Sequence, residues 1–254
     1  MTKPEIEIRE VTTVEDLAEC VALQREVFAS PDLEISPVRH LIVTRHAGGW
    51  TLGAYADGRL AGFVLSVPMF RNGGAAAERA FYSHMTAVRQ EFQNLRIGAR
   101  LKWAQRERAL SEGVSYIKWT YQPVQARNAF FNLERLGATI RTYMPNFYGT
   151  DYSTSAEQNR VIGLDSDRLF ADWQLDAPKA IALSKGEKYT ETGTAARTIE
   201  IPNDWNNLVA TNPEKAVAEQ ARIKREFQKA FAEGLICKGF ERSETNPKYL
   251  LFEE

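Results

Sequence analysis

The sequence predicts an α/β fold: a mixed, mostly antiparallel central sheet with helices on both faces, plus a smaller C-terminal α+β extension. Two observations lead to this class. The expected elements between residues 6 and 144 follow in the order strand, helix, helix, three strands, helix, strand, helix, strand. A run of antiparallel strands followed by two strand–helix units implies a mixed sheet with helices on both faces. Apolar residues make up 44% of the 254 residues, which is enough for a sizeable core.

Composition and charge argue against several classes of function. A net charge of −1 argues against broad electrostatic binding to nucleic acid or to an anionic membrane. Cys20 and Cys237 lie far apart in the sequence, and no Cys/His cluster has zinc-ligand spacing. No apolar run approaches the length of a membrane span, and the first residues lack a signal-peptide pattern. We therefore expect a cytoplasmic protein with no disulfide framework, metal, nucleic-acid partner or membrane partner.

The first elements are a strand and a helix. Alternating apolar residues predict the strand over residues 6–11. Thr12 followed by Glu15 forms a capping box for a helix over residues 14–28. Three residues are expected on the inner face of this helix: Leu17, Val21 and Phe28.

A second helix is expected after Ser36-Pro37, which fit the N-cap and the first helical position. Gly48-Gly49 ends this helix. Its inward-facing residues are expected to be Val38, Leu41 and Ile42.

The middle of the chain is predicted to be rich in strands. Strands over residues 50–56 and 60–69 flank Asp57-Gly58, which is a strong hairpin signal. Residues 71–77, RNGGAAA, are expected to form a loop. Five elements follow: a strand over 83–88, a helix from Ile97 to Glu112-Gly113, a strand over 114–121, a helix over 126–136 ended by Gly137, and a strand over 140–144.

The character of the sequence changes after Tyr148, so we place a first domain over residues 1–150 and the extension over residues 151–254. Asn212-Pro213 is expected to begin a helix that ends near Phe231. One stripe of this helix is expected to carry Val217, Ala221, Lys224, Phe227 and Phe231. The other expected elements are a loop over 150–159, a strand over 167–175 with Leu169, Ala171, Trp173 and Leu175 on one face, a flexible connection over 184–197, and a terminal hairpin of 235–240 with 249–252.

Residues 82–103, YSHMTAVRQEFQNLRIGARLKW, contain the most informative pattern. A strand that feeds a helix through a polar loop aims several unpaired backbone N–H groups at one point. The helix dipole adds partial positive charge there. The point therefore suits an anion such as a pyrophosphate.

The same stretch resembles the acyl-CoA loop of the GCN5-related N-acetyltransferase (GNAT) superfamily, and the resemblance extends over residues 6–148. The family loop reads Gln/Arg-x-x-Gly-x-Gly/Ala after a strand with a small-apolar-Val ending; here Ala87-Val88 and then Gln93-Asn94-Leu95-Arg96-Ile97-Gly98-Ala99 occupy these positions. The resemblance implies a GNAT fold, an acyl-CoA co-substrate such as acetyl-CoA, and no metal. The residues that it implies for coenzyme binding on the strand and loop are Thr86, Ala87, Val88, Gln93, Asn94, Leu95, Arg96, Ile97, Gly98 and Ala99.

Arg96 departs from the family pattern, because it stands where the family usually has its first glycine. Glycine permits the closest approach of a ligand to the backbone. Two interpretations of Arg96 remain open: it has ordinary right-handed helical geometry, or its side chain reaches a phosphate.

Residues 128–138 resemble the late helix of the family and its leucine–glycine turn. In many members a tyrosine four residues before that glycine protonates the departing thiolate; here this residue is Leu133, which cannot donate a proton. The usual coenzyme-side asparagine is Ala126 here, and we assign its role to the nearby Asn128. A thiol is already a good leaving group, so transfer does not require the missing acid. Three tyrosines are candidates to replace it: Tyr121, Tyr143 and Tyr148.

His84 is the predicted catalytic residue. It lies four residues before Val88, on the strand expected to line the acyl site. Strand alternation predicts Tyr82, His84 and Thr86 on one face and Ser83, Met85 and Ala87 on the other. Aminolysis of a thioester needs a neutral amine, and a histidine near its ordinary pKa suits the removal of an ammonium proton. In an arylalkylamine-acetylating branch of the GNAT superfamily this position also carries a histidine thought to act as base. The alternative is a buried histidine that is bonded to a neighbouring carbonyl.

Other charged residues receive weaker assignments. Of the basic residues near the predicted helix start, Arg96 and Arg100 are candidates to meet phosphates, and Lys102, Arg106 and Arg108 are expected on a solvated face. Asp165, Asp167 and Arg168 are expected to form a turn or a cap rather than a catalytic site. Three arginines fit a substrate carboxylate equally well: Arg39, Arg45 and Arg79.

These residues predict an acyl-CoA-dependent N-acyltransferase. An amine loses a proton to His84 and attacks the thioester carbonyl, which backbone N–H groups near Ala87-Val88 polarise. The whole length, including SDRLFADW and IPNDW, resembles a group of long bacterial GNAT proteins, some of them associated with N-succinylation of amino acids. This resemblance implies a small amine or amino acid as acceptor. Two alternatives remain: succinyl-CoA as donor, and a non-catalytic acyl-CoA sensor. The extension is expected to shape the acceptor pocket or to support a homodimer.

Overall fold

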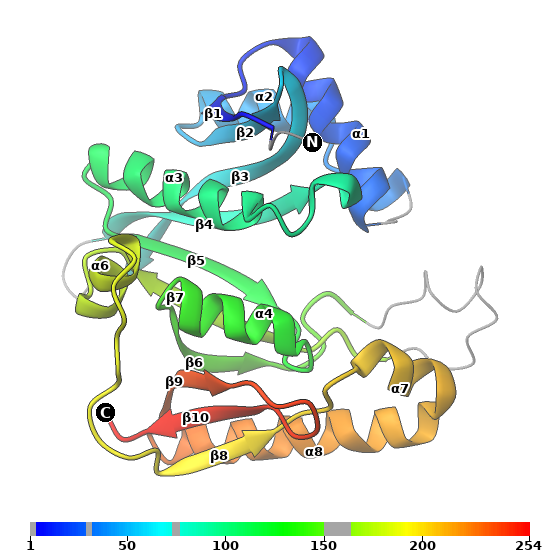
Figure 1. The fold of residues 1–254 in the computed structure, drawn as a ribbon, viewed down its shortest axis with the longest axis vertical. Helices are drawn as coiled ribbons and strands as arrows, with labels where there is room; N and C mark the ends of the chain where they lie inside the picture. Colours follow the sequence, from blue (N-terminus) through cyan, green and yellow to red (C-terminus); the bar gives the residue numbers. More distant parts are fainter. Residues whose placement is uncertain (1–3, 29–31, 73–76, 150–163) are drawn as a thin grey trace. The chain divides into compact units, whose positions relative to one another are not determined.

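The chain is described by a computed structural model over residues 4–28, 32–72, 77–149 and 164–254 (Figure 1). These residues form two compact units, residues 1–118 and 119–254. The domain limit predicted at residue 150 falls at the edge of the undescribed residues 150–163, so it stays a prediction. The loop expected over residues 150–159 lies outside the described residues.

Five strands build the sheet of the first unit, and its last strand continues into the second unit. In their order across the sheet they are β1 (Ile6–Glu10), β2 (Trp50–Ala56), β3 (Arg59–Asn72), β4 (Ala77–Val88) and β5 (Tyr116–Tyr121). The pairs β1/β2, β2/β3 and β3/β4 are antiparallel, while β4 and β5 run parallel. Asp57 and Gly58 have φ angles of 47° and 83°, as the predicted hairpin turn requires. The loop expected over residues 71–77 is shorter than predicted, because β3 continues to Asn72 and β4 begins at Ala77.

Helices cover both faces of this sheet, which confirms the predicted fold class. They are α1 (Val14–Phe28), α2 (Val38–His46) and α3 (Ile97–Ser111). Leu17 and Leu41, from α1 and α2, share a buried core with Leu65 of β3. The next residue of β3, Ser66, accepts a hydrogen bond from Gln105 of α3 at 2.8 Å. Since neighbouring strand residues point to opposite faces, α3 covers the other face.

The start of each N-terminal helix differs in detail from the prediction. Thr13, not Thr12, caps α1, because its Oγ1 lies close enough to accept from the Asp16 N–H at 3.1 Å. Pro37 is the N-cap of α2 in place of Ser36. The backbone of Ser36 is instead held by the side chain of Gln24, at 2.9 and 3.1 Å.

The predicted inner face of α1 is wrong for one residue. Phe28, the last residue of the helix, is 43% exposed. The neighbouring Val27 packs on the core in its place.

The second unit has its own strands and helices (Figure 1). Its strand order is β7 (Arg168–Gln174), β6 (Thr139–Met144), β9 (Ile236–Glu241), β10 (Lys248–Phe252) and β8 (Arg197–Glu200). Its helices are α4 (Ala126–Phe130), which continues as the π-helical turn η3 (Phe131–Arg135), α6 (Pro178–Ser184), α7 (Trp205–Thr211) and α8 (Pro213–Ala232). The terminal hairpin and the buried face of β7 are confirmed. α6, α7 and β8 were not predicted, because each spans seven residues or fewer and gives too short a pattern.

The predicted start of α8 is confirmed, because Asn212 Oδ1 accepts from the Lys215 N–H at 3.1 Å. The predicted stripe is wrong for Val217, which is 42% exposed; Phe227 is buried, and Ala221, Lys224 and Phe231 are half-buried. The fully buried residues of α8 are Ala216, Ile223, Phe227 and Ala230. None of the described helices is long and apolar enough to cross a membrane.

Candidate functional site

The polar loop after β4 leads into α3 with an unusual backbone. Asn94 and Arg96 have φ angles of 69° and 61°, in the left-handed region that residues with a side chain seldom adopt. Arg96 is the N-cap of α3, and its side chain makes no capping hydrogen bond. Left-handed residues next to a helix start turn successive N–H groups toward one side, which favours an anion.

The geometry of Arg96 settles one of its two interpretations. Ordinary right-handed geometry is wrong, because this arginine has the backbone conformation of a glycine. A left-handed conformation costs an ordinary residue roughly 1–2 kcal/mol. The side chain of Arg96 is exposed, so the second interpretation, a phosphate contact, stays a prediction.

The first turn of α3 presents unbonded N–H groups. Its first intrahelical bond runs from the Arg100 N–H to the Arg96 carbonyl at 3.0 Å. The N–H groups of Ile97, Gly98 and Ala99 therefore have no acceptor within the helix. A Cβ added at Gly98 would meet nothing closer than Val88 Cγ2, at 3.9 Å, so protein packing does not demand glycine there.

Arg89 holds the beginning of this loop in place. Its role was not predicted, because a lone arginine after a strand forms no recognisable sequence motif. Its Nε donates to the Leu60 carbonyl at 2.9 Å. Its guanidinium pairs with Glu19 at 3.1 Å and with Glu26. Gln93 Nε2 also donates to the Val88 carbonyl at 3.4 Å. These bonds tie the loop to β3, β4 and α1.

His84 occupies a β-bulge on β4. Leu65 pairs with Met85 and Ser66 pairs with Ser83, so His84 has no partner residue on β3. A bulge shifts the alternation of side chains by one residue and re-aims them.

The bulge overturns one predicted face of β4. Ser83 Oγ accepts from Lys102 Nζ on α3 at 3.0 Å. Met85 and Ala87 instead pack in the core beneath α1 and α2. The grouping of Ser83 with Met85 and Ala87 is therefore wrong, because His84 is an extra residue in the strand.

The imidazole of His84 is exposed and has polar neighbours. Its Nε2 lies 3.4 Å from Ser36 Oγ. The ring of His40, on α2, stands edge-on to it with 6.0 Å between centroids. Partial loss of hydration, and secondarily His40, lower the pKa of His84 below its ordinary value of 6.5. The imidazole is therefore neutral at neutral pH and able to accept a proton, and its neighbour is a hydroxyl rather than the carbonyl of the alternative interpretation.

The edge of β4 beyond Tyr82 completes the arrangement. Within the described part of residues 4–118, β4 pairs with β5 at Phe81 and Tyr82 and no further along. Ser83 and residues 85–88 pair with β3 on their other edge. The first unit thus leaves backbone N–H groups of β4 unpaired between the imidazole and the start of α3.

Comparison with known proteins identifies the domain. Residues 14–138 match the sequence model of the acetyltransferase (GNAT) family. Residues 14–138 are a GNAT acetyltransferase domain. At the level of the family, its activity is acyl-CoA-dependent N-acetylation.

Solved structures confirm the GNAT fold. The ribosomal-protein-S18-alanine N-acetyltransferase from Escherichia coli has a TM-score of 0.52 and 15% identity, over 68% of this chain and 96% of that one. A putative GNAT acetyltransferase from Desulfovibrio desulfuricans gives 0.53 and 15%, over 67% and 99%. A putative acetyltransferase from Acinetobacter baylyi gives 0.52 and 15%, over 70% and 97%. No curated protein sequence matches this chain.

The second unit of this GNAT protein supplies few exposed groups from the predicted set. Leu133 is completely buried, and Asn128 is exposed on α4, where its role stays a prediction. Tyr121 and Tyr143 are buried, and burial raises the pKa of both. The exposed Tyr148 has its hydroxyl 3.3 Å from Thr120 Oγ1. Of the three candidate acids, Tyr148 therefore has the accessible hydroxyl.

Asp167 has the predicted capping role. Its Oδ1 accepts from the Asn146 N–H at 2.8 Å, and its Oδ2 accepts from the Tyr143 hydroxyl at 2.6 Å. Asp165 pairs with Lys224 at 3.3 Å. These contacts hold a turn of the second unit together.

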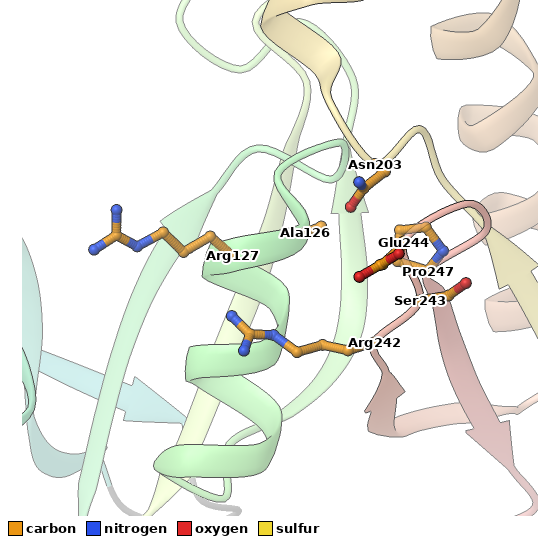
Figure 2. A pocket seen from close by; sticks show the side chains of 7 residues that line it. All are labelled: Ala126, Arg127, Asn203, Arg242, Ser243, Glu244 and Pro247. Atoms are coloured by element: carbon orange, nitrogen blue, oxygen red, sulfur yellow. The ribbon is translucent and has the colours of Figure 1, made fainter. Parts of the chain in front are cut away.

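A hollow of about 420 Å³ lies at the start of α4 (Figure 2). It is lined by Ala126, Arg127, Asn203, Arg242, Ser243, Glu244 and Pro247. Arg127 points away from the other lining residues, and the Arg242 guanidinium lies 4.1 Å from the centroid of the Phe130 ring. Ser243 Oγ accepts from the Thr245 and Asn246 N–H groups of its own turn. The hollow therefore adds no evident catalytic group.

The basic residues of α3 differ from the prediction. Lys102 and Arg106 are 3% and 7% exposed, so the solvated face expected there is wrong for both. Arg108 is solvated and pairs with Glu112 at 2.8 Å. Arg100 donates to the Ile6 carbonyl at 2.7 Å. α3 therefore turns polar side chains toward the sheet, where Ser66 and Ser83 accept hydrogen bonds from them.

The three arginines predicted to bind a substrate carboxylate differ in their ion pairs. Arg79 pairs with Glu112 at 2.7 Å, and Arg45 lies 3.7 Å from Glu10. Arg39 is exposed on α2 and forms no ion pair with the residues that the structure describes.

Proposed function

We propose that this protein transfers an acyl group from acyl-CoA, acetyl-CoA in the first instance, to the amine of a small molecule such as an amino acid. The observation that carries the proposal is the continuous run of residues 84–99. An exposed imidazole on a bulge comes first, and the loop with left-handed residues at the start of α3 follows. A proton acceptor and an anion site thus lie on one strand–loop–helix segment.

The donor site is assigned to the backbone. The pyrophosphate of the coenzyme would accept hydrogen bonds from the N–H groups of Ile97, Gly98 and Ala99, with the dipole of α3 in support. Arg96 would add a cation. The remaining assigned residues of the first unit, Gln93, Asn94 and Leu95, shape the loop, while Thr86, Ala87 and Val88 provide the strand edge.

The reaction needs one side chain that accepts a proton from the acceptor. The ammonium of the acceptor gives a proton to the neutral imidazole of His84, and the resulting amine attacks the thioester carbonyl. Unpaired N–H groups of β4 stabilise the oxyanion while the new C–N bond forms. The C–S bond then breaks, the coenzyme leaves as a thiolate, and the amide nitrogen gives its second proton to solvent water. Leu133 donates no proton, so this scheme relies on the thiolate as a good leaving group.

The acceptor is assigned from α2. Arg39 is exposed and adjacent in sequence to His40, whose ring stands 6.0 Å from that of His84. A guanidinium binds a carboxylate through two parallel hydrogen bonds. An α-amino acid carries a carboxylate beside its amine, which supports an amino acid as acceptor.

Two alternatives keep specific support. Succinyl-CoA as donor would use the same donor site, because the coenzyme portion is identical. A non-catalytic acyl-CoA sensor is supported by the buried Leu133 at the usual position of the acid.

Thiol release from acetyl-CoA and succinyl-CoA across a panel of amines and amino acids tests the proposal. We expect turnover with acetyl-CoA and a carboxylate-bearing amine, and a rise in Tm with CoA. Tight CoA binding without any turnover would favour the sensor. Failure of CoA to raise the Tm at concentrations well above micromolar would overturn the donor site itself.

A further inference from the structure

The inner face of α3 is unusually polar for a helix that packs on a sheet. Lys102 and Gln105 are 3% and 0% exposed, and the two serines that face them, Ser66 and Ser83, are 0% and 5% exposed. Charged side chains are seldom buried in this way unless they have a specific partner. These four side chains need an explanation that the donor site does not give.

The four side chains form a continuous chain of hydrogen bonds. Lys102 Nζ donates to Ser83 Oγ at 3.0 Å and to Gln105 Oε1 at 2.7 Å. Gln105 Nε2 then donates to Ser66 Oγ at 2.8 Å. The chain therefore starts on β4, passes along α3 and ends on β3.

The two ends of this chain are the register partners at the bulge. Ser66 pairs with Ser83, the residue directly before His84, and the pairing then resumes at Leu65 with Met85. The hydrogen bonds thus fix the strand pairing on one side of the extra residue. A bulge sets the direction of its side chains, and this network holds the strand pair directly beside His84.

Lys102 is an expensive residue to use for packing alone. Burial lowers the pKa of its amine well below the ordinary value of 10.5, since the charged form loses its hydration. A methionine of similar length would avoid this cost. Buried polar networks that are satisfied fix one arrangement of the groups they join.

We propose that Lys102 is a positioning residue for acyl transfer: through Ser83 it holds the β4 bulge in the arrangement that presents the His84 imidazole to the acceptor amine. This inference rests on the proposed function of His84. Lys102 touches neither substrate nor coenzyme in this account.

Lys102→Met and Ser83→Ala test the proposal in the full-length protein. Lys102→Met keeps the length of the side chain and removes its donor, while Ser83→Ala removes the acceptor and is a small change that the fold should accept. Arg106→Met is the matched control, because Arg106 is also a buried cation of α3 but bonds Glu107 at 2.6 Å. His84→Asn, measured beside them, assigns the His84 resonances in a protein with ¹⁵N-labelled histidine.

Both network variants should lower kcat/KM for the acceptor roughly ten- to hundredfold, as a small misplacement of a reacting group does. The Kd for CoA should change less than about twofold, far below one tenfold step in affinity. The His84 resonances and their titration should shift in both variants and stay as in the wild type in Arg106→Met. If Lys102 and Ser83 only stabilised the fold, their variants would not shift the His84 resonances while leaving the Kd for CoA and the Tm unchanged.

Unchanged His84 resonances in Lys102→Met and Ser83→Ala would overturn the inference, whatever the rates. If His84→Asn retains full activity, the proposed function fails instead, and the resonances still decide whether Lys102 sets the bulge. A loss of CoA affinity equal to the loss of rate would also contradict the inference, because the network would then act on the donor site.

Discussion

The loop after β4 and the bulge within β4 belong to one segment of the first unit, yet the loop is built from backbone groups and the bulge from side chains. The loop depends on backbone: two residues with positive φ and the unbonded N–H groups at the start of α3. The bulge depends on side chains, namely His84 with Ser36 on one face and Ser83 with Lys102 on the other. Every residue except proline supplies an N–H group, so a backbone site tolerates a change such as glycine to Arg96. A site made of side chains should tolerate far less.

His84→Asn should have the largest effect of any single change. Removal of a general base costs about 100- to 10,000-fold in rate, so kcat/KM for the acceptor should fall by that factor. The Kd for CoA, measured by calorimetry, should stay unchanged because the loop is intact. His40→Asn is the control on α2 and should lose much less activity. Similar losses in both variants would show that His84 has no special role.

Gly98→Val tests the backbone side of the comparison. A branched side chain in the first turn of α3 should block close approach of the pyrophosphate and raise the Kd for CoA about tenfold, or 1.4 kcal/mol. Gly98→Ala is the control and should bind CoA as the wild type does, because the family motif has glycine or alanine at this position and the nearest atom to the new Cβ is 3.9 Å away. An unchanged Kd in Gly98→Val would remove Gly98 from the donor site.

Arg39→Gln sharpens the assignment of the acceptor. Loss of a charge-assisted hydrogen bond costs about 1.5–3 kcal/mol, so KM for an amino acid should rise roughly tenfold or more. KM for the corresponding amine without a carboxylate should stay the same. Arg45→Gln serves as control, since Arg45 already lies beside Glu10. Equal effects of Arg39→Gln on both acceptors would contradict carboxylate recognition.

Arg96→Gly should have the smallest effect, and its sign is unusual. Glycine relieves the left-handed strain, so the free energy of unfolding should rise by roughly 1 kcal/mol in urea denaturation. Arg96→Ala removes the same guanidinium but keeps the strain, so it should not be stabilised. If both variants weaken CoA binding equally, the lost affinity is due to the guanidinium, which both variants lack. If the glycine variant is no more stable than the alanine variant, the backbone of Arg96 is not strained.

Much of the fold was predictable because local signals define it. Asp57-Gly58 predicted the turn between β2 and β3, and the bounds of α1 agree with the prediction. The start of α3 was predictable from the spacing between Val88 and Gly98. The bulge was not, because it arises from the pairing of β4 with β3, and nothing within β4 itself reveals which residue lacks a partner.

The burial of Lys102 escaped prediction for a similar reason. A lysine in a helix with other basic residues normally indicates a solvated face. Its acceptors, Ser83 and Gln105, come from β4 and from one turn further along α3. Only the packing of α3 on the sheet brings these groups together, and a pattern along one helix does not show it.

The central claim, that His84 takes the proton of the acceptor, is tested most directly by the pH dependence of kcat/KM for an acceptor amine in the wild type and in His84→Asn. The acceptor for this test is an amine of high basicity: it stays an ammonium throughout the acidic range and has a proton for His84 to take, so the acidic limb reports the enzyme. Protonation removes the base, so the rate should fall as the pH drops through the pKa of His84. This limb should lie below the ordinary imidazole pKa of about 6.5, because partial loss of hydration and His40, the titratable group that faces it from α2, lower the pKa of His84. The limb should be absent from His84→Asn, which keeps His40 and Ser36; the same limb in the variant would contradict the claim.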